Sequence, residues 1–421
     1  MLPKKLKQKY RISQVQELKP IDNQLEPFQW FADMRKETPI RYDQKYATWD
    51  VFDYRHAREV LSSHSIFKFD TKSVSPIIKE NITGLNPPRH TKIRNIVSGY
   101  FQQKMMEHWS PAIDEIISTL ISSKRADNTF DLVSDLGYRV PILCSAQMMG
   151  IPQHQVHYIE EWANILNQTT MQNTPQSDSC PFHTFIAANN VYNMARFSAS
   201  IYKLLRGRKK IVALFKSLIE KRMSSDSGND IISYLLHTEI NGYRMNQNEI
   251  IDFLFQLILV GNGTTTHLIT NSVRCMLDEN LMARLQQDNS LFPTFIEEVL
   301  RYRSPKCFTW RYASETCQLG GHHIKKGDQI VVWLASANRD EEVFEQANQF
   351  IPDRTPNRHL AFGIGLHYCI GASLARTQTQ LVLQALLKEM KNLRYSESFR
   401  PEPAAHLVFH SYRSLKLDYT T

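Results

Sequence analysis

A glycine-rich turn near the end of the chain carries one cysteine, and it is the segment best suited to metal chemistry. Residues 362–371 read FGIGLHYCIG. Gly363, Gly365 and Gly371 remove side chains where the backbone could pass close to a flat ligand, which leaves the Cys369 sulfur exposed to that ligand. The apolar-periodic run over 372–390 predicts a helix that begins directly after the turn. Free N–H groups at its start favour a thiolate, the form that binds a haem iron.

A buried apolar cysteine in a glycine-rich turn is the alternative interpretation of Cys369. A second signal is the spacing of Glu298 and Arg301, which share one face of a predicted helix. An isolated pair of this kind is usually an ordinary surface ion pair. Further motifs occur in a fixed order along the chain, at residues 86–94 (NPPRHTKIR), 260–266 (VGNGTTT) and 310–313 (WRYA).

This series resembles the cytochrome P450 family in its soluble bacterial form, from about residue 25 to the C-terminus. The cysteine turn matches the family's haem-binding pattern at every defining position. The resemblance implies haem b, with Cys369 as the iron ligand and Gly363 and Gly371 beside the haem. It implies that Phe362 packs next to the thiolate and keeps water from the sulfur. Glu298 and Arg301 are then structural and tie their helix to the loop around residues 353–354.

A haem carries two propionates, and burying these charges requires cations or hydrogen-bond donors. The resemblance assigns four residues to this role: His90, Arg94, Arg311 and His367. His90 and Arg94 lie one helical turn apart, after the two prolines at 87 and 88. Asn86 stands where the family often has Asp, which is a minor departure.

The predicted helix around residue 260 contains glycines that a purely structural helix would avoid. Gly261 and Gly263 each cost about 1 kcal/mol relative to alanine. In the family this segment crosses the distal face of the haem and is locally opened for oxygen. Thr264 takes the role of supplying protons there, although a hydroxyl bonded to the preceding turn is the alternative. The family usually has Asp or Glu where this chain has Gly263, so water or Asn262 would have to carry the proton.

The elements that must position these residues are mostly helical. Apolar periodicity predicts helices over 108–124, 133–149, 196–223, 247–277 and 291–303, and strands over 47–52 and 329–333, with turns at 320–321 and 326–328. The expected fold class is mainly α with small β-sheets (α+β), with the haem between a long distal helix and a proximal cysteine loop. We expect residues 1–24 to be a basic extension of the same unit, and residues 25–421 to be a single haem-thiolate oxygenase domain.

Composition limits the partners. The 421 residues carry a formal charge of +8, and six cysteines are scattered without CxxC spacing, which suggests neither a zinc site nor a disulfide framework. The basic N-terminus lacks an apolar core, so we expect no signal peptide or membrane anchor and a cytoplasmic protein. The densest basic cluster is typical of a solvated helix face: Lys203, Arg206, Arg208, Lys209 and Lys210. We expect no nucleic-acid or membrane partner, and an acidic ferredoxin or flavodoxin as the electron donor that the family uses.

The resemblance predicts a monooxygenase that inserts one atom of O2 into a small lipophilic molecule. Gly263 leaves open a peroxide-driven or atypical oxidation on the same fold, such as coupling or desaturation, and a non-enzymatic haem sensor is a more remote alternative. Family pocket positions include parts of 66–85 and two further groups. These groups are Lys306, Cys307 and Phe308, and Leu407, Val408 and Phe409. Residues 168–185, which break the periodicity, are expected to form a mobile lid.

Overall fold

The computed structural model describes residues 25–69, 82–124, 127–167, 194–224, 228–404 and 408–420. Most of this part is helical. The α-helices are α3 (Phe28–Glu37), α4 (Tyr54–Ser62), α5 (Arg89–Tyr100), α6 (Gln103–Ser122), α7 (Arg139–Met148), α8 (Val156–Asn167), α10 (Met194–Met223), α11 (Ile231–His237), α12 (Gln247–Asp278), α13 (Met282–Gln287), α14 (Phe292–Tyr302), α15 (Leu334–Ala337) and α16 (Ala372–Glu389). A short π-helical segment (Val133–Gly137) precedes α7, and a single 3-10 turn (Gly365–His367) precedes α16.

The strands form three small sheets. They are β1 (Ile40–Asp43), β2 (Thr48–Val51), β3 (Phe67–Lys68), β4 (Thr129–Asp131), β5 (Thr309–Ala313), β6 (Cys317–Leu319), β7 (His322–Ile324), β8 (Gln329–Val332), β9 (Lys391–Tyr395) and β10 (Lys416–Thr420). The largest sheet has the order β1-β2-β8-β5-β3, in which β2 and β8 are parallel and the other pairs antiparallel. Strand β5 pairs Arg311 with Ile330 of β8, and because neighbouring side chains alternate, Thr309 and Arg311 share the buried face.

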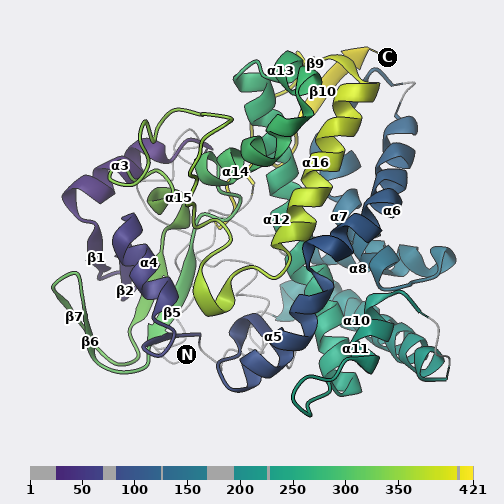
Figure 1. Cartoon of the computed structure of the whole chain (residues 1–421), viewed down its shortest axis with the longest axis horizontal. Coiled ribbons are helices and arrows are strands. Elements are labelled where there is room, and N and C mark those ends of the chain that lie inside the picture. Colours follow the sequence, from purple (N-terminus) through teal and green to yellow (C-terminus); the bar gives the residue numbers. More distant parts are fainter. Residues whose placement is uncertain are drawn as a thin grey trace.

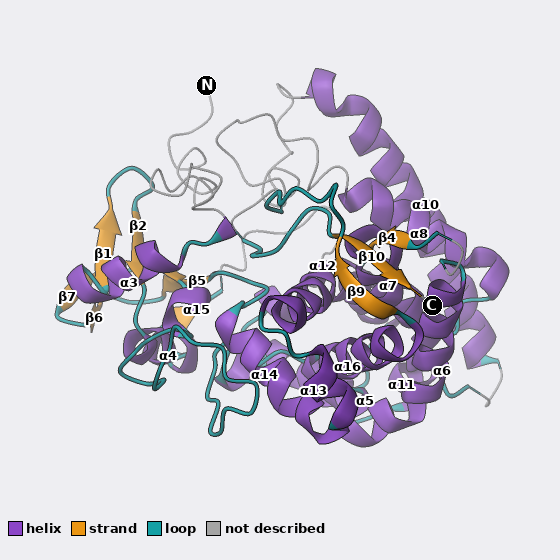
Figure 2. Ribbon diagram, turned by 90° about the horizontal axis from the view of Figure 1, so that it is seen from above, coloured by secondary structure: helices purple, strands orange, loops and turns teal. Residues whose placement is uncertain are grey.

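The largest sheet and most helices occupy different sides of the molecule. In Figure 1 the strands β1, β2, β5, β6 and β7 lie on the left with α3, α4 and α15, while α6, α7, α8, α10 and α11 lie on the right. Figure 2 shows the same separation from above, with the sheet β4-β10-β9 on the helical side. Helices α12 and α16 run side by side in the centre, so they separate the two regions.

Helix α12 is the longest described helix, and its start is fixed by a capping box. The Asn246 side chain accepts hydrogen bonds from the N–H groups of Asn248 and Glu249, and the Glu249 carboxylate accepts from the Asn246 N–H at 2.8 Å. Both sides of the helix are buried over much of its length, because α7, α10, α14 and α16 pack around it. Helix α12 therefore spans the centre of the protein and forms one wall of the site described below.

The predicted elements are largely confirmed. The five expected helices correspond to α6, the π-helical segment with α7, α10, α12 and α14, and the two expected strands correspond to β2 and β8. The predicted turns are present, since Gly320, Gly321 and Gly327 have φ between +54° and +89°. The helical, α+β class is also confirmed. The prediction for 108–124 began too late, because α6 starts at Gln103 and continues through Pro111.

Several other expectations concern particular segments. Residues 1–24 and the expected lid at 168–185 lie outside the described residues. The basic cluster lies on α10, where Lys203, Arg206, Lys209 and Lys210 are exposed, as in a solvated helix face. Within the described ranges, the search for a helix with the length and hydropathy of a membrane span finds none.

Candidate functional site

A cavity of about 280 Å³ lies where α12, α5, β5 and the cysteine turn meet. Segments far apart in the sequence thus line one cavity. Of the residues predicted to act on a cofactor or on oxygen, the following line it: His90, Arg94, Gly261, Thr264, Arg311, Phe362, Gly363, His367, Cys369 and Gly371. The predicted convergence of these motifs is therefore confirmed as geometry, while the individual roles stay predictions.

Backbone hydrogen bonds close the cysteine turn on itself. The Cys369 N–H donates to the Phe362 carbonyl at 2.9 Å, and the Gly363 N–H donates to the Leu360 carbonyl at 2.8 Å. Gly363 and Gly365 both have φ of +71°, a left-handed conformation that side chains disfavour. A Cβ added at Gly371 would meet nothing within 4 Å, so the backbone there faces open space. The turn presents the Cys369 sulfur to the cavity with little around it.

The expectation of an acidified thiol at Cys369 is corrected by the structure. Burial raises the pKa of Cys369 above its ordinary value, although the Gly371 N–H and the charges of Arg94 and Arg376 act in the opposite direction. The helix start therefore does not by itself produce a thiolate. A coordinated metal ion deprotonates a thiol outright, so binding of the iron supplies the missing stabilisation.

Four nitrogen-bearing side chains gather above the turn. Arg94 from α5 donates to the Tyr368 carbonyl at 2.6 Å. The Arg311 guanidinium lies 3.9 Å from the centre of the Phe69 ring and donates to the Trp310 carbonyl at 2.8 Å. The rings of His90 and His367 approach to 4.3 Å between centroids. The four residues predicted to hold propionates are thus neighbours in space.

Charge in this group resides on the arginines. Burial lowers the pKa of His90 to about 4 and that of His367 to about 3, so both imidazoles are neutral near pH 7 and offer N–H donors. Burial lowers the pKa of Arg311 only to about 10, so its guanidinium stays charged. Among the described residues, no carboxylate pairs with Arg311, and His90 Nδ1 has no hydrogen-bond partner.

These observations fit a haem. Among the described residues, a lone thiol faces an open wall, the buried Arg311 guanidinium has no carboxylate partner, and an imidazole nitrogen of His90 has no hydrogen-bond partner, which matches an iron ligand and two propionates. Arg94, Arg311, His90 and His367 are the residues that would hold the propionates. Cys369 would bind the iron.

The distal wall is formed by α12, which runs as α-helix without interruption through the expected opening. Gly261 and Thr264 line the cavity, whereas Asn262 and Gly263 do not. The Thr264 hydroxyl donates to the Val260 carbonyl at 3.1 Å, so its proton is held within the helix while its lone pairs face the cavity. Thr265 also lines the cavity and donates to the Gly261 carbonyl at 2.8 Å.

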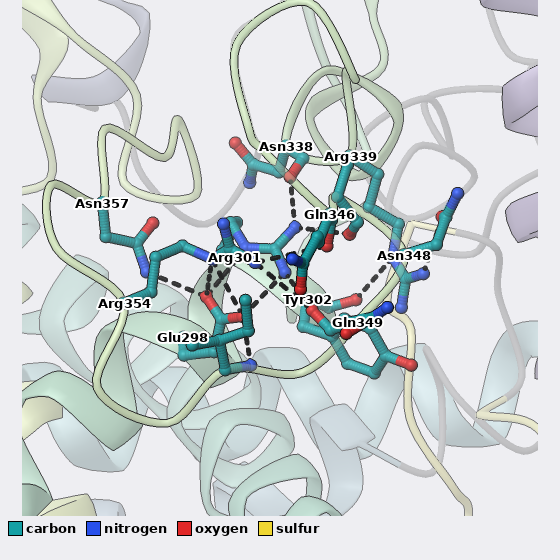
Figure 3. A network of polar contacts seen from close by, with 12 residues as sticks. Glu298, Arg301, Tyr302, Asn338, Arg339, Gln346, Asn348, Gln349, Arg354 and Asn357 are labelled. Atoms are coloured by element: carbon teal, nitrogen blue, oxygen red, sulfur yellow. Dashed lines mark hydrogen bonds and ion pairs between the residues drawn. The ribbon is translucent and has the colours of Figure 1, made fainter.

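Glu298 and Arg301 are fully buried, and the predicted structural role fits their contacts. Two guanidinium nitrogens of Arg301 donate to the Glu298 carboxylate at 2.7 and 2.8 Å, and Arg354 donates to the same carboxylate at 3.1 Å (Figure 3). Asn357 adds a further hydrogen bond at 3.1 Å. Arg301 also donates to the carbonyls of Asn338, Ala347 and Gln349. This network joins α14 to the segment that leads into the cysteine turn.

The contact to the predicted loop is made by Arg354 and its neighbours rather than by Asp353. Asp353 does not take part in the network, because its carboxylate pairs instead with Arg284 at 2.7 Å on the exposed surface. Arg354 forms the ion pair that links the loop to Glu298, and the Ile351 N–H and Asn357 side chain add hydrogen bonds. A carboxylate beside Glu298 would repel it, so the outward orientation of Asp353 is the expected result of like charges.

A second ion pair behind the turn was not predicted. Glu297 accepts two hydrogen bonds from Arg376 of α16, at 2.6 and 2.8 Å, and one from His359 at 3.1 Å. Burial alone would raise the pKa of Glu297, but the hydrogen bonds from Arg376 and His359 lower it to about 2. The Arg376 guanidinium also lies 4.6 Å from the centre of the Phe362 ring. The sequence signal for this pair was the acid directly before Glu298, because adjacent residues of a helix point in different directions and Glu297 must therefore meet another partner.

Of the described residues predicted to contact substrate at 306–308 and 408–409, one lines the cavity and the others do not. Lys306 lines the cavity, whereas Cys307 and Phe308 pack against Trp333 and Val331 in a separate aromatic core. Val408 belongs to the same core, and Phe409 lies 5.0 Å from the His267 ring, so neither lines the cavity. Leu407 lies outside the described residues. Packing between segments explains the split, because Cys307 is hydrogen-bonded to Val408 and Ala335 and Phe308 packs against Trp333.

Most of the remaining wall is hydrocarbon, and this part was only partly foreseen. Residues 66–85 contribute Phe69, Ile82 and Thr83 as expected. Other apolar side chains come from α12, α4 and the start of α15, namely Leu61, Phe253, Leu257, Val260, Leu268 and Leu334. The apolar run over 253–260 was the available signal for the α12 contribution. The cavity is suited to a lipophilic ligand.

Comparisons with known proteins agree with this geometry. The family model described as "Cytochrome P450" matches residues 6–407. Cytochrome P450 109 of Bacillus spizizenii is 32% identical over 374 residues, covering 89% of this chain and 86% of the relative. Cytochrome P450(BM-1) of Priestia megaterium is 31% identical over 396 residues, with 90% of each covered. The crystal structure of CYP109E1 from Bacillus megaterium in complex with corticosterone has a TM-score of 0.84 at 30% identity, covering 95% of this chain and 100% of that chain.

Proposed function

The chain belongs to the cytochrome P450 family of haem-containing oxidoreductases, and we propose that it inserts one oxygen atom from O2 into a small lipophilic molecule. A separate acidic ferredoxin or flavodoxin supplies the electrons. The observation that carries this proposal is the single cavity shared by Cys369, the two arginines and the apolar wall of α12. The corticosterone complex of CYP109E1 supports a lipophilic substrate class.

When bound, the haem supplies the activation of dioxygen, and the protein's own residues prepare the site for it. Cys369 would bind the iron as a thiolate, a ligand whose electron donation suits the haem to oxygen activation. Arg94 and Arg311 neutralise the propionates, while the His90 and His367 N–H groups donate to them. Apolar side chains of α12 exclude water and orient the substrate. Thr264 places Oγ1 on the distal wall, where its lone pairs can accept a hydrogen bond from water or from a ligand hydroxyl and so position a proton donor.

Proton supply is the part of the reaction for which this chain has an unusual arrangement. Among the described residues no Asp or Glu lines the cavity, and Gly263 stands where the family usually has an acid. Asn262 is buried off the wall. Protons therefore reach Thr264 through water. This arrangement favours a second candidate function, a peroxide-driven or atypical oxidation, in which the reaction needs fewer delivered protons.

The electron donor is proposed to dock beside the cysteine turn. Tyr368, next to the iron ligand, is 39% exposed, and the side chain of Arg376 is about one third exposed. The formal charge of +8 favours an acidic partner, because opposite charges steer association. The same proposal includes the domain organisation: residues 25–421 act as one oxygenase unit, and residues 1–24 are its extension. It also includes a cytoplasmic location without nucleic-acid or membrane partners.

Turnover with two oxidant systems tests the proposal. The purified holoprotein is first screened with lipophilic compounds, corticosterone included, for the absorption change that follows displacement of water from ferric iron. Compounds that bind are then incubated with NADPH, a surrogate reductase and a ferredoxin, or with hydrogen peroxide alone. We expect a product containing one added oxygen with the electron-transfer system. Product formation with peroxide only would reject the ferredoxin-dependent reaction and establish the second candidate.

A further inference from the structure

Lys306 adds a positive charge to a cavity that Arg94 and Arg311 also line and that is otherwise walled mostly by apolar side chains. It lies between α14 and β5, and its half-buried side chain lines the same cavity as Thr264 and Val260. Transfer of an ammonium group into such surroundings is costly unless an opposite charge or hydrogen-bonding groups compensate it. The position of Lys306 therefore requires a reason.

Protein groups provide little compensation. Within the described residues no carboxylate forms an ion pair with the Lys306 ammonium, and the wall of the cavity carries no acid. The Trp310 ring, at 5.6 Å from Nζ to its centroid, offers only a modest cation–π attraction. Burial and the like charge of Arg311 lower the pKa of Lys306 to about 8, and a negative charge on the Cys369 sulfur acts in the opposite direction, so the ammonium form still predominates at pH 7.

The backbone that follows Lys306 is held in place by hydrogen bonds, which keeps the lysine on the cavity side. The Cys307 N–H donates to the Val408 carbonyl at 2.8 Å, and the Cys307 carbonyl accepts from the Ala335 N–H at 3.0 Å. Phe308 is buried in the aromatic core. Cys307 is held by these hydrogen bonds and Phe308 packs against Trp333, so Lys306 alone of the three residues faces the cavity.

We propose that Lys306 binds the carboxylate of a lipophilic acid, so that the substrate is an amphipathic carboxylate. The inference rests on the proposed monooxygenase function and narrows its substrate class. An ammonium offers three N–H donors, and a charge-assisted hydrogen bond to a carboxylate is strong in a low-dielectric site. The hydrocarbon part of the acid then lies against Leu257 and Val260 of α12. Anchoring one end of the substrate restricts which carbon the reaction can reach.

Paired acids and esters test the inference in the haem-loaded protein. Octanoic, lauric and palmitic acids and their methyl esters are titrated at pH 7, and binding is followed by isothermal calorimetry and by the haem absorption change. We expect the best acid to bind roughly 30-fold more tightly than its ester. Lys306→Met should remove this preference, and Lys306→Arg, which keeps the charge, should retain most of it. Lys326→Met, on the exposed turn before β8, serves as the matched control and should change nothing.

The outcomes separate this inference from the proposed function. Equal affinity for acid and ester, no binding of any acid, or an acid preference that survives in Lys306→Met would overturn the role of Lys306. Loss of haem from Lys306→Met would also overturn it, since the lysine would then serve the cofactor. In each case, oxygenated product from a neutral lipophile would leave the proposed function standing. The proposed function fails instead if no lipophile yields product with the electron-transfer system.

Discussion

The proximal and distal sides of the cavity differ in whether their charged side chains are paired within the protein. Behind the cysteine turn, Glu297 and Glu298 are paired with Arg376, Arg301 and Arg354 through several hydrogen bonds each. On the distal side, the Lys306 ammonium has no carboxylate partner among the described residues. Charges paired within the protein fix a structure, whereas a charge left facing a cavity is available to a ligand. The proximal wall holds the iron ligand, and the distal wall meets substrate.

Glu298→Gln should cause the largest loss of stability. The side chain is fully buried and accepts hydrogen bonds from Arg301, Arg354, Asn357 and the Ile351 N–H. Removing its charge leaves two buried guanidinium groups uncompensated, for which we expect a loss of about 3–5 kcal/mol in the free energy of unfolding. Chemical denaturation followed by circular dichroism measures it. Glu297→Gln, at the more exposed neighbouring position, should cost about 1 kcal/mol; equal losses for both variants would contradict the distinction between the two pairs.

The stabilising contribution of Glu297 should depend on pH. Its folded-state pKa is lowered to about 2 from the model-peptide value of 4.5. A carboxyl group with a lowered folded pKa stabilises the protein above its unfolded pKa, and this contribution is lost as the pH falls from 4.5 towards 2. The difference in Tm between the wild type and Glu297→Gln should therefore be constant from pH 7 to about pH 5 and shrink below it. A difference that grows on acidification would show that the sign is wrong.

Thr264→Ala tests the catalytic side of the comparison. In the described part of the chain its hydroxyl hydrogen-bonds within α12 alone, so the change should leave the Tm almost unaltered. Loss of an oxygen that positions a proton donor should lower the product formed per NADPH consumed several-fold and increase peroxide release. Thr265→Ala removes an equivalent hydrogen bond one residue along the helix and is the matched control. If the two variants lose product equally, Thr264 has no special role.

Gly263→Glu is expected to have the smallest effect. A carboxylate at this position would restore the acid that the family usually carries and raise the product formed per NADPH, on the order of twofold. The increase is limited because Gly263 does not line the cavity, so the new group must act through water. Gly263→Gln has nearly the same size without an ionisable proton. An equal gain in the glutamine variant, or no gain in either, would exclude proton supply as the limiting step.

Local sequence patterns were sufficient to predict the proximal wall around the cysteine turn, but they were insufficient to predict which side chains line the distal wall. The cysteine turn and the Glu298/Arg301 spacing could be recognised because glycine positions and helical periodicity act over a few residues. The sheet β4-β10-β9 joins residues near 130, 393 and 418, and such distant pairing leaves no local signal. The direction of Phe308 and the lack of a partner for Lys306 depend on packing between segments. The acidity of Cys369 was misjudged because burial opposes the helix start.

Replacement of the iron ligand tests the central claim most directly. Cys369→Ser keeps the size of the side chain, and Cys317→Ser, at a half-buried position outside the cavity, is the control. The reduced, carbon monoxide-bound protein is examined by absorption spectroscopy, with circular dichroism as the check on folding. We predict that a folded Cys369→Ser variant loses the Soret band typical of thiolate-ligated haem, while Cys317→Ser keeps it. An unchanged thiolate-type band in Cys369→Ser would contradict the account.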